Sequence, residues 1–217
     1  MESNWAAEHL QAIRTLMERS ALYRRALAPV MTANGVLGAL AAAIGLMARV
    51  EAPRAFLGYW MAVALAAVAS SFLLARRQAL KDAEPFWSPP TRRVAQALAP
   101  SLFFGFVLGL LLAALEPALR PGAGAALGLF WLPLVWIALY GCALHAAGFF
   151  MPRGMKIFGW ALVLASSLLG AIGAFGFLEE WIRPPLFGHS LMGLVFGLAH
   201  LAYGIYLYFT ERRGNEP

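Results

Sequence analysis

Long apolar segments alternate with short polar connections along the whole chain. A helix needs about 20 mostly apolar residues to cross the ~30 Å hydrocarbon core of a bilayer. Six segments meet this requirement, and none of them contains Asp, Glu, Lys or Arg in its interior. Charged residues or prolines bound each segment. The predicted spans are residues 28–48, 56–75, 97–115, 125–150, 157–178 and 190–209.

The segment before the first span, residues 1–27, predicts a shorter helix of a different kind. Trp5, Leu10, Ile13 and Met17 recur at helical spacing on one side, and charged residues occupy the other side. Such a helix lies on anionic headgroups with its tryptophan as an anchor. The alternative is a helix that docks onto a partner protein or a second copy of this chain. Both interpretations require the same apolar stripe, so the pattern leaves them open.

Together these elements predict an all-α integral membrane protein with one six-transmembrane-helix bundle, residues 28–209. The amphipathic helix of residues 1–27 precedes it, and a short cytoplasmic tail, residues 210–217, follows it. The first apolar run is too long for the core of a cleaved signal peptide, so we expect none. The longest connection runs from Arg76 to Val94, and its prolines and aromatic pair predict an extended segment at the interface.

Composition supports lipid as the solvent. The 217 residues are 61% hydrophobic and 13% charged, whereas soluble domains carry roughly 25% charged residues. Too few polar residues remain to cover a water-exposed fold of this size. The Ala, Gly and Arg bias is typical of a GC-rich bacterial gene, which predicts the bacterial inner membrane as the location.

The positive charge predicts the orientation. A net charge of +6 is compatible with nucleic-acid binding, but the cations lie at the ends of spans, so we expect no nucleic acid. Lys and Arg in short loops mark the cytoplasmic side, which predicts that both termini are cytoplasmic. The residues on that side are Arg14, Arg19, Arg24, Arg25, Arg76, Arg77, Lys81, Arg92, Arg93, Arg153, Lys156, Arg212 and Arg213, against Arg49, Arg54, Arg120 and Arg183 on the other.

Small residues recur along one side of several spans. Helices in lipid associate through close backbone contact at such residues, so these stripes predict the helix–helix interfaces of a compact bundle. Pro133, inside the fourth span, predicts a kink. The stripes are Gly38, Ala42 and Gly45; Gly105 and Gly109; Gly159, Ser166, Gly170 and Gly173; and Gly193, Gly197 and Gly204.

Histidines are the ionisable residues that remain inside the spans, and such residues are the first place to look for function. His145 and His200 lie on the glycine faces of their helices, so both are predicted to face inward. They differ in depth by roughly 6 Å. No cofactor is expected, but two such imidazoles are candidate axial ligands of a b-type haem or of a metal with Cys142. The structural alternative is that each histidine ties helices together by hydrogen bonds.

Other polar residues are predicted to join a network inside the bundle: Asn34, Tyr140, Cys142 and His189. No catalytic set is evident, and no Asp, Glu or Lys lies near the midplane, where ion-coupled transporters usually hold one. We therefore expect a non-enzymatic accessory, sensory or assembly subunit that acts through partners, or through a second copy, at its cytoplasmic face. The alternatives are a haem- or metal-binding membrane protein and a small oligomeric transporter or channel.

Overall fold

The computed structural model describes residues 26–83, 85–119, 123, 126–175 and 184–213. Most of the predicted amphipathic helix, with Trp5, Leu10, Ile13 and Met17, lies outside these residues. Residues 26 and 27 are helical and begin the first described helix. The last four residues of the predicted tail also lie outside the described part.

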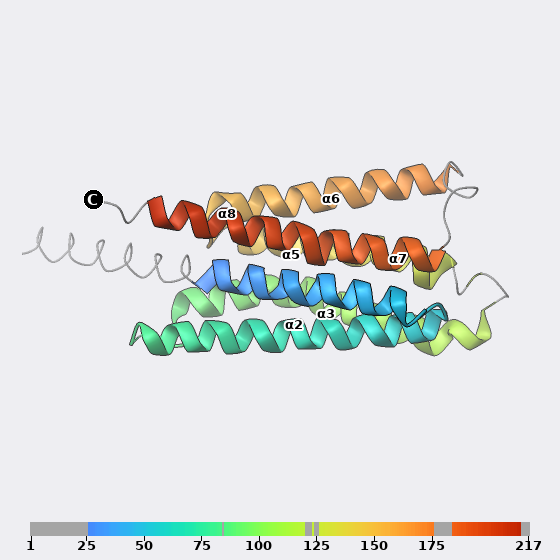
Figure 1. Ribbon diagram of the computed structural model, residues 1–217, viewed down its shortest axis with the longest axis horizontal. Helices are drawn as coiled ribbons and strands as arrows, with labels where there is room; N and C mark the ends of the chain where they lie inside the picture. The colour runs from blue at the N-terminus through green and yellow to red at the C-terminus, as the bar shows by residue number, and fades with distance from the viewer. Residues whose placement is uncertain (1–25, 84, 120–122, 124–125, 176–183, 214–217) are drawn as a thin grey trace, which may run out of the picture.

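The described residues form helices that run up and down one bundle, with no strand among them (Figure 1). Six helices are long and apolar enough to cross a membrane, as predicted. We call the continuous helix Pro184–Thr210 the last span. The elements are the first helix, Ala26–Met47; α2, Pro53–Lys81; α3, Pro89–Leu115; η1, Glu116–Ala118; η2, Ala126–Trp131; α5, Leu132–Ala147; α6, Arg153–Ala174; α7, Pro184–Met192; η3, Gly193–Ala199; and α8, His200–Arg213.

The connection between α2 and α3 is shorter than predicted. We expected a loop from Arg76 to Val94, but α2 continues to Lys81 and α3 begins at Pro89. Lysine and arginine end an apolar run without ending a helix, because both are good helix formers. The connection itself folds back onto α2, since the ring of Phe86 meets that of Phe72 at 4.9 Å.

The fourth span, Ala126–Ala147, lies at the centre of the bundle. Half of its apolar window is buried, against 11% for α3 and 17% for α2 and α6. Its α5 portion packs against both α3 and α6. The last span is the next most buried, at 44%, so the interior is built mainly from these two helices.

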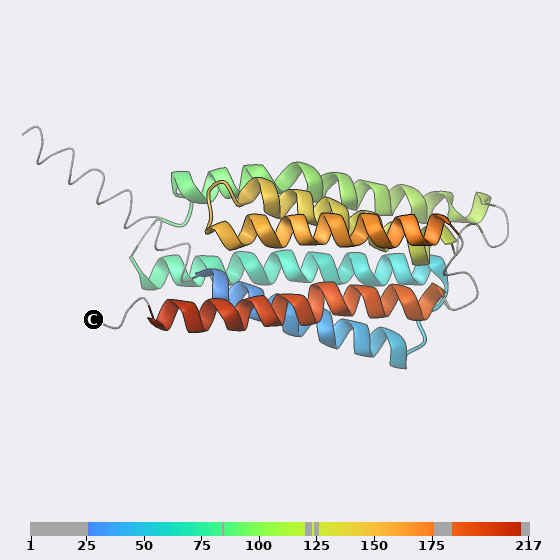
Figure 2. The ribbon, with the colours of Figure 1, turned by 90° about the horizontal axis from the view of Figure 1, so that it is seen from above.

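Glycines bring the first helix against the last span, and both views show the two helices side by side (Figure 2). A Cβ on Gly35 would lie 2.5 Å from the backbone nitrogen of Leu201, and one on Gly197 would lie 2.8 Å from that of Ala39. No side chain fits at such distances without a backbone shift. The predicted stripes of these two helices therefore face each other.

The same close packing joins α5 to α6. A Cβ on Gly141 would lie 2.7 Å from the carbonyl oxygen of Gly159, and the reverse distance is 2.6 Å. On the other side of α5, Trp136 packs beside Gly109 of α3 and donates its indole N–H to the carbonyl of Gly105 at 2.8 Å. The predicted stripes of α3 and α6 thus also lie at helix contacts.

Two of the described spans contain π-helical turns. In such a turn each N–H bonds the carbonyl five residues earlier instead of four, so the helix is wider. Pro133 follows the first of them, η2, and lacks the N–H that would bond the carbonyl four residues earlier, at Leu129. That carbonyl lies beside Gly188, where a Cβ would approach it to 2.7 Å. The predicted kink position is therefore a local change of helix type, packed against the last span.

Candidate functional site

His200 lies where η3 passes into α8, and it is 1% exposed. Its Nδ1 is 2.8 Å from the carbonyl oxygen of Val195, and its Nε2 is 2.8 Å from the hydroxyl of Tyr140 on α5. A carbonyl only accepts hydrogen bonds, so Nδ1 carries a proton. In the neutral ring Nε2 then accepts the proton of the Tyr140 hydroxyl.

The π-helical segment explains why this carbonyl is within reach. Val195 lies five residues before His200, inside Gly193–Ala199. The widened turn presents its carbonyl to the ring that follows. Two phenylalanines pack against the imidazole: Phe196 stacks on it with centroids 5.8 Å apart, and Phe158 of α6 meets it edge-on at 5.4 Å. Three spans thus meet at His200.

His189 lies in α7, near the start of the last span, and is also 1% exposed. Its Nε2 donates to the carbonyl of Val50 at 3.0 Å, and its Nδ1 accepts the indole N–H of Trp60 at 3.2 Å. An indole N–H can only donate and a carbonyl can only accept. Both partners are therefore satisfied by one form of the ring, the neutral tautomer with its proton on Nε2.

Aromatic rings and one glycine enclose His189. Phe56 meets the imidazole at 4.8 Å and Tyr59 at 6.0 Å, both edge-on. Gly45, near the end of the first helix, leaves room for the ring, because a Cβ there would lie 2.5 Å from Nδ1. Tyr59 also donates its hydroxyl to the carbonyl of Ala41 at 2.5 Å. We call His189, Trp60, Phe56, Tyr59 and Gly45 the His189 cage.

His145, the other predicted ligand, has different surroundings from His200. Its ring is half-buried and meets Phe149 and Trp160 edge-on at 5.4 Å. Both of these side chains are exposed on the outside of the bundle. Its Nδ1 has no hydrogen-bond partner among the described residues. In the described structure, no residue forms a hydrogen bond or a ring contact with both histidines.

The structure also separates Cys142 from the histidines, because it is exposed on the outside of α5. It follows the interface residue Gly141, and one residue turns a helix by 100°, so its side chain leaves the packed face. The described residues contain no cluster of three His, Cys, Asp or Glu side chains that could hold a metal. An iron bound at Nε2 of His200 would displace the Tyr140 hydroxyl.

Asn34 forms the predicted polar contact between the first helix and a neighbour. Its amide donates to the Ser71 hydroxyl at 2.9 Å and accepts from the Ser70 hydroxyl at 3.0 Å. Both ends of the carboxamide are used here, so Asn34 ties the first helix to α2. The serine pair on α2 was not among the predicted site residues, although two adjacent hydroxyls in an apolar span were a usable signal.

Trp60 and Val50 were also missed. A tryptophan inside an apolar span predicts packing or an interface anchor, and a backbone carbonyl in a connection carries no sequence signal.

Comparison with known proteins gives no match to this chain among family models, curated proteins or solved structures. The geometry is therefore the basis for any functional assignment.

Proposed function

We propose that this chain is a multi-pass protein of the bacterial cytoplasmic membrane that acts as a non-enzymatic accessory, sensory or assembly component. The observation that carries the membrane location is the outer surface of the bundle. Large apolar side chains are exposed on its helices, for example Leu40 at 57%, Phe103 at 70% and Leu168 at 63%. Soluble proteins rarely expose such a continuous apolar surface, whereas lipid covers it without cost.

The distribution of charge supports an orientation with both termini in the cytoplasm. In the described structure, the basic end of the bundle is the end where α2 stops and α3 and α6 begin. Lys81, Arg92, Arg93, Arg153 and Lys156 lie there. The opposite end mixes Arg49 and Arg54 with Glu51 and Glu116. An excess of Lys and Arg in short loops marks the side that stays in the cytoplasm.

The interior of the bundle supports a role in which the outer faces and the ends of the bundle contact partners. Its two fully buried histidines form hydrogen bonds between helices, His200 with Tyr140 and His189 with Trp60. Glycine contacts close the space between the first helix and the last span. A rigid bundle of this kind offers partners its outer faces and its ends.

The orientation can be tested with the chain's one cysteine removed. In a Cys142→Ser background, Ala52→Cys reports on the opposite end and Trp87→Cys on the basic end. We expect a membrane-impermeant maleimide to label Ala52→Cys in intact cells, and Trp87→Cys only after the cytoplasmic membrane is opened. The reverse pattern would contradict the orientation, and release of the protein by alkaline carbonate would contradict membrane insertion.

The partner-dependent role has its own test. Photo-crosslinking residues placed at the Trp87 and Ala52 positions in native membranes should capture a defined protein or a second copy from the basic end. Wild-type chain reconstituted alone into vesicles should show no solute flux above that of empty vesicles. Substantial flux by the chain alone would favour the transporter alternative.

A further inference from the structure

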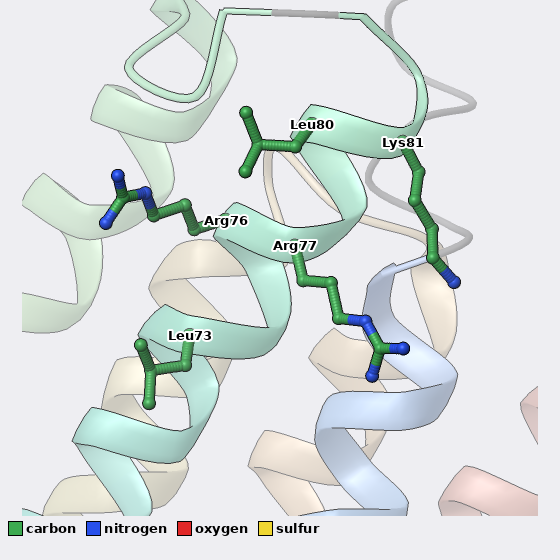
Figure 3. Close-up of a pocket in the computed structure, with 5 residues that line it drawn as sticks. All are labelled: Leu73, Arg76, Arg77, Leu80 and Lys81. Atoms are coloured by element: carbon green, nitrogen blue, oxygen red, sulfur yellow. The ribbon is translucent and has the colours of Figure 1, made fainter.

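One face of α2 combines exposed leucines with three cations near the basic end of the bundle. Leu73, Arg76, Arg77, Leu80 and Lys81 line a hollow there, and Figure 3 shows their side chains along the last turns of the helix. Their spacing of three, four, seven and eight residues places them on one side of a helix, within an arc of about 140°.

The leucines occupy the middle of this arc. At 100° per residue Leu80 lies about 20° from Leu73, whereas Arg76 lies about 60° to one side and Lys81 about 80° to the other. Figure 3 shows the same division: Arg76 extends toward α3, and Arg77 and Lys81 extend toward the first helix. The hollow therefore has an apolar centre, with cations on both sides of it.

The depth of these residues suits an amphipathic ligand. Eight residues separate Leu73 from Lys81, which is about 12 Å along the axis. Leu73 and Leu80 are 61% and 71% exposed, so their apolar surface is available. The leucine nearer the middle of α2 lies where acyl chains would run, and the cations near its end lie at headgroup level.

We propose that this hollow binds an anionic phospholipid, with the phosphate held by Arg76, Arg77 and Lys81 and an acyl chain lying along Leu73. The proposal rests on the membrane location proposed above. Charge complementarity is its main argument, because basic pockets at the cytoplasmic side of spans attract anionic headgroups. The nearest carboxylate in sequence, Asp82, accepts a hydrogen bond from the Gln78 amide at 3.0 Å, and the face keeps an excess of positive charge.

The apolar surface beside the cations favours a lipid over a soluble phosphate. A free phosphate ion would use the three cations and make no contact with Leu73. A lipid pairs with the cations and packs an acyl chain against Leu73 at once. Arginine also suits the ligand, since its guanidinium pairs with phosphate through two parallel hydrogen bonds.

The experiment uses the full chain in nanodiscs of equimolar phosphatidylglycerol and phosphatidylcholine, followed by native mass spectrometry of the lipids that stay bound. Wild-type protein should retain phosphatidylglycerol in preference. R76Q/R77Q/K81Q should reduce this preference on the order of 100-fold, from the usual effect of a cation beside an anionic headgroup. The matched control R92Q/R93Q/R153Q removes the same charge at the same end and should keep the preference.

Each other outcome decides against the site. Equal loss in the control would indicate general attraction to the basic end, and no preference in wild type would remove the site altogether. Displacement of the lipid by millimolar inorganic phosphate would indicate a phosphate site instead. A protein that enters nanodiscs without preference contradicts this inference alone, whereas one that fails to enter them contradicts the proposed membrane location.

Discussion

The two buried histidines of the last span form the same two kinds of hydrogen bond, but with opposite ring nitrogens. His189 and His200 are each 1% exposed, and each pairs one ring nitrogen with a backbone carbonyl and the other with an aromatic side chain. The proton that bonds the carbonyl is on Nε2 in His189 and on Nδ1 in His200. The tautomer of each ring is therefore set by which nitrogen faces the carbonyl.

The aromatic partners make the larger difference. Trp60 offers an N–H that can only donate, so a second proton on His189 would be directed at another proton. Tyr140 offers a hydroxyl that both donates and accepts, so His200 can hold one or two protons and keep both hydrogen bonds. The His189 cage is thus a rigid joint between the first helix, α2 and the last span, whereas His200 is an adaptable contact between the last span and α5.

The largest expected effect comes from removing the rigid joint. His189→Ala leaves the Trp60 N–H and the Val50 carbonyl without a partner and opens a cavity among aromatic rings. We expect a loss of roughly 3 kcal/mol in the free energy of unfolding, measured by denaturation in detergent. His145→Ala is the matched control, because that ring is half-buried, and it should cost clearly less. Equal costs would contradict the special status of the His189 cage.

A smaller effect should follow from filling the space beside His189. The Cβ of Gly45→Ala would lie 2.5 Å from Nδ1, so the ring must move and its bond to Trp60 must lengthen. Overpacking of this kind costs about 1–3 kcal/mol. Gly58→Ala on α2 is the control, since nothing lies within 4 Å of its added Cβ, and helix propensity should make it neutral or slightly stabilising. If Gly45→Ala left the free energy of unfolding unchanged, the His189 ring could move without cost, and the cage would not be rigid.

These contacts mark the boundary of what the sequence could predict. Hydropathy predicted six spans, because a span is defined by composition and length. Spacing also predicted that the glycine stripes, which include Gly38 and Gly197, lie at helix interfaces, since a close approach requires small residues. Both depend on properties that lie within one helix.

The pairing of polar groups depends on which helices are neighbours, and periodicity carries no such information. His145 was placed by angle on the glycine face of α5 and lies there beside Gly159 of α6, but its ring contacts Trp160 and Phe149 and not the surroundings of His200. The π-helical turn before His200 adds another limit, because angles of 100° per residue do not hold across it. The Val195 carbonyl therefore could not be identified as a partner from the sequence.

The adaptable contact should respond weakly to loss of its partner. Tyr140→Phe removes the hydroxyl, but His200 keeps its bond to Val195 and its packing against Phe196 and Phe158. Hydrogen bonds between helices in bilayers average about 0.6 kcal/mol, and we expect a loss of that order in the free energy of unfolding. Tyr206→Phe, at a ring that is 58% exposed, should cost nothing measurable. A loss for Tyr140→Phe as large as that for His189→Ala would erase the contrast between the two sites.

The tautomers themselves provide the finest test, because they involve no loss of stability. Nitrogen-15 NMR of histidine-labelled protein, assigned with single His→Gln variants, should show the proton of His189 on Nε2 and that of His200 on Nδ1. Trp60→Phe removes the donor that holds Nδ1 of His189 bare, so that nitrogen becomes free to take a proton. Tyr140→Phe should leave His200 unchanged, because the Val195 carbonyl still requires a proton on Nδ1. Identical tautomers in the wild-type protein would mean that the carbonyls do not decide where these protons lie. The distinction between the rigid joint at His189 and the adaptable contact at His200 would then be wrong.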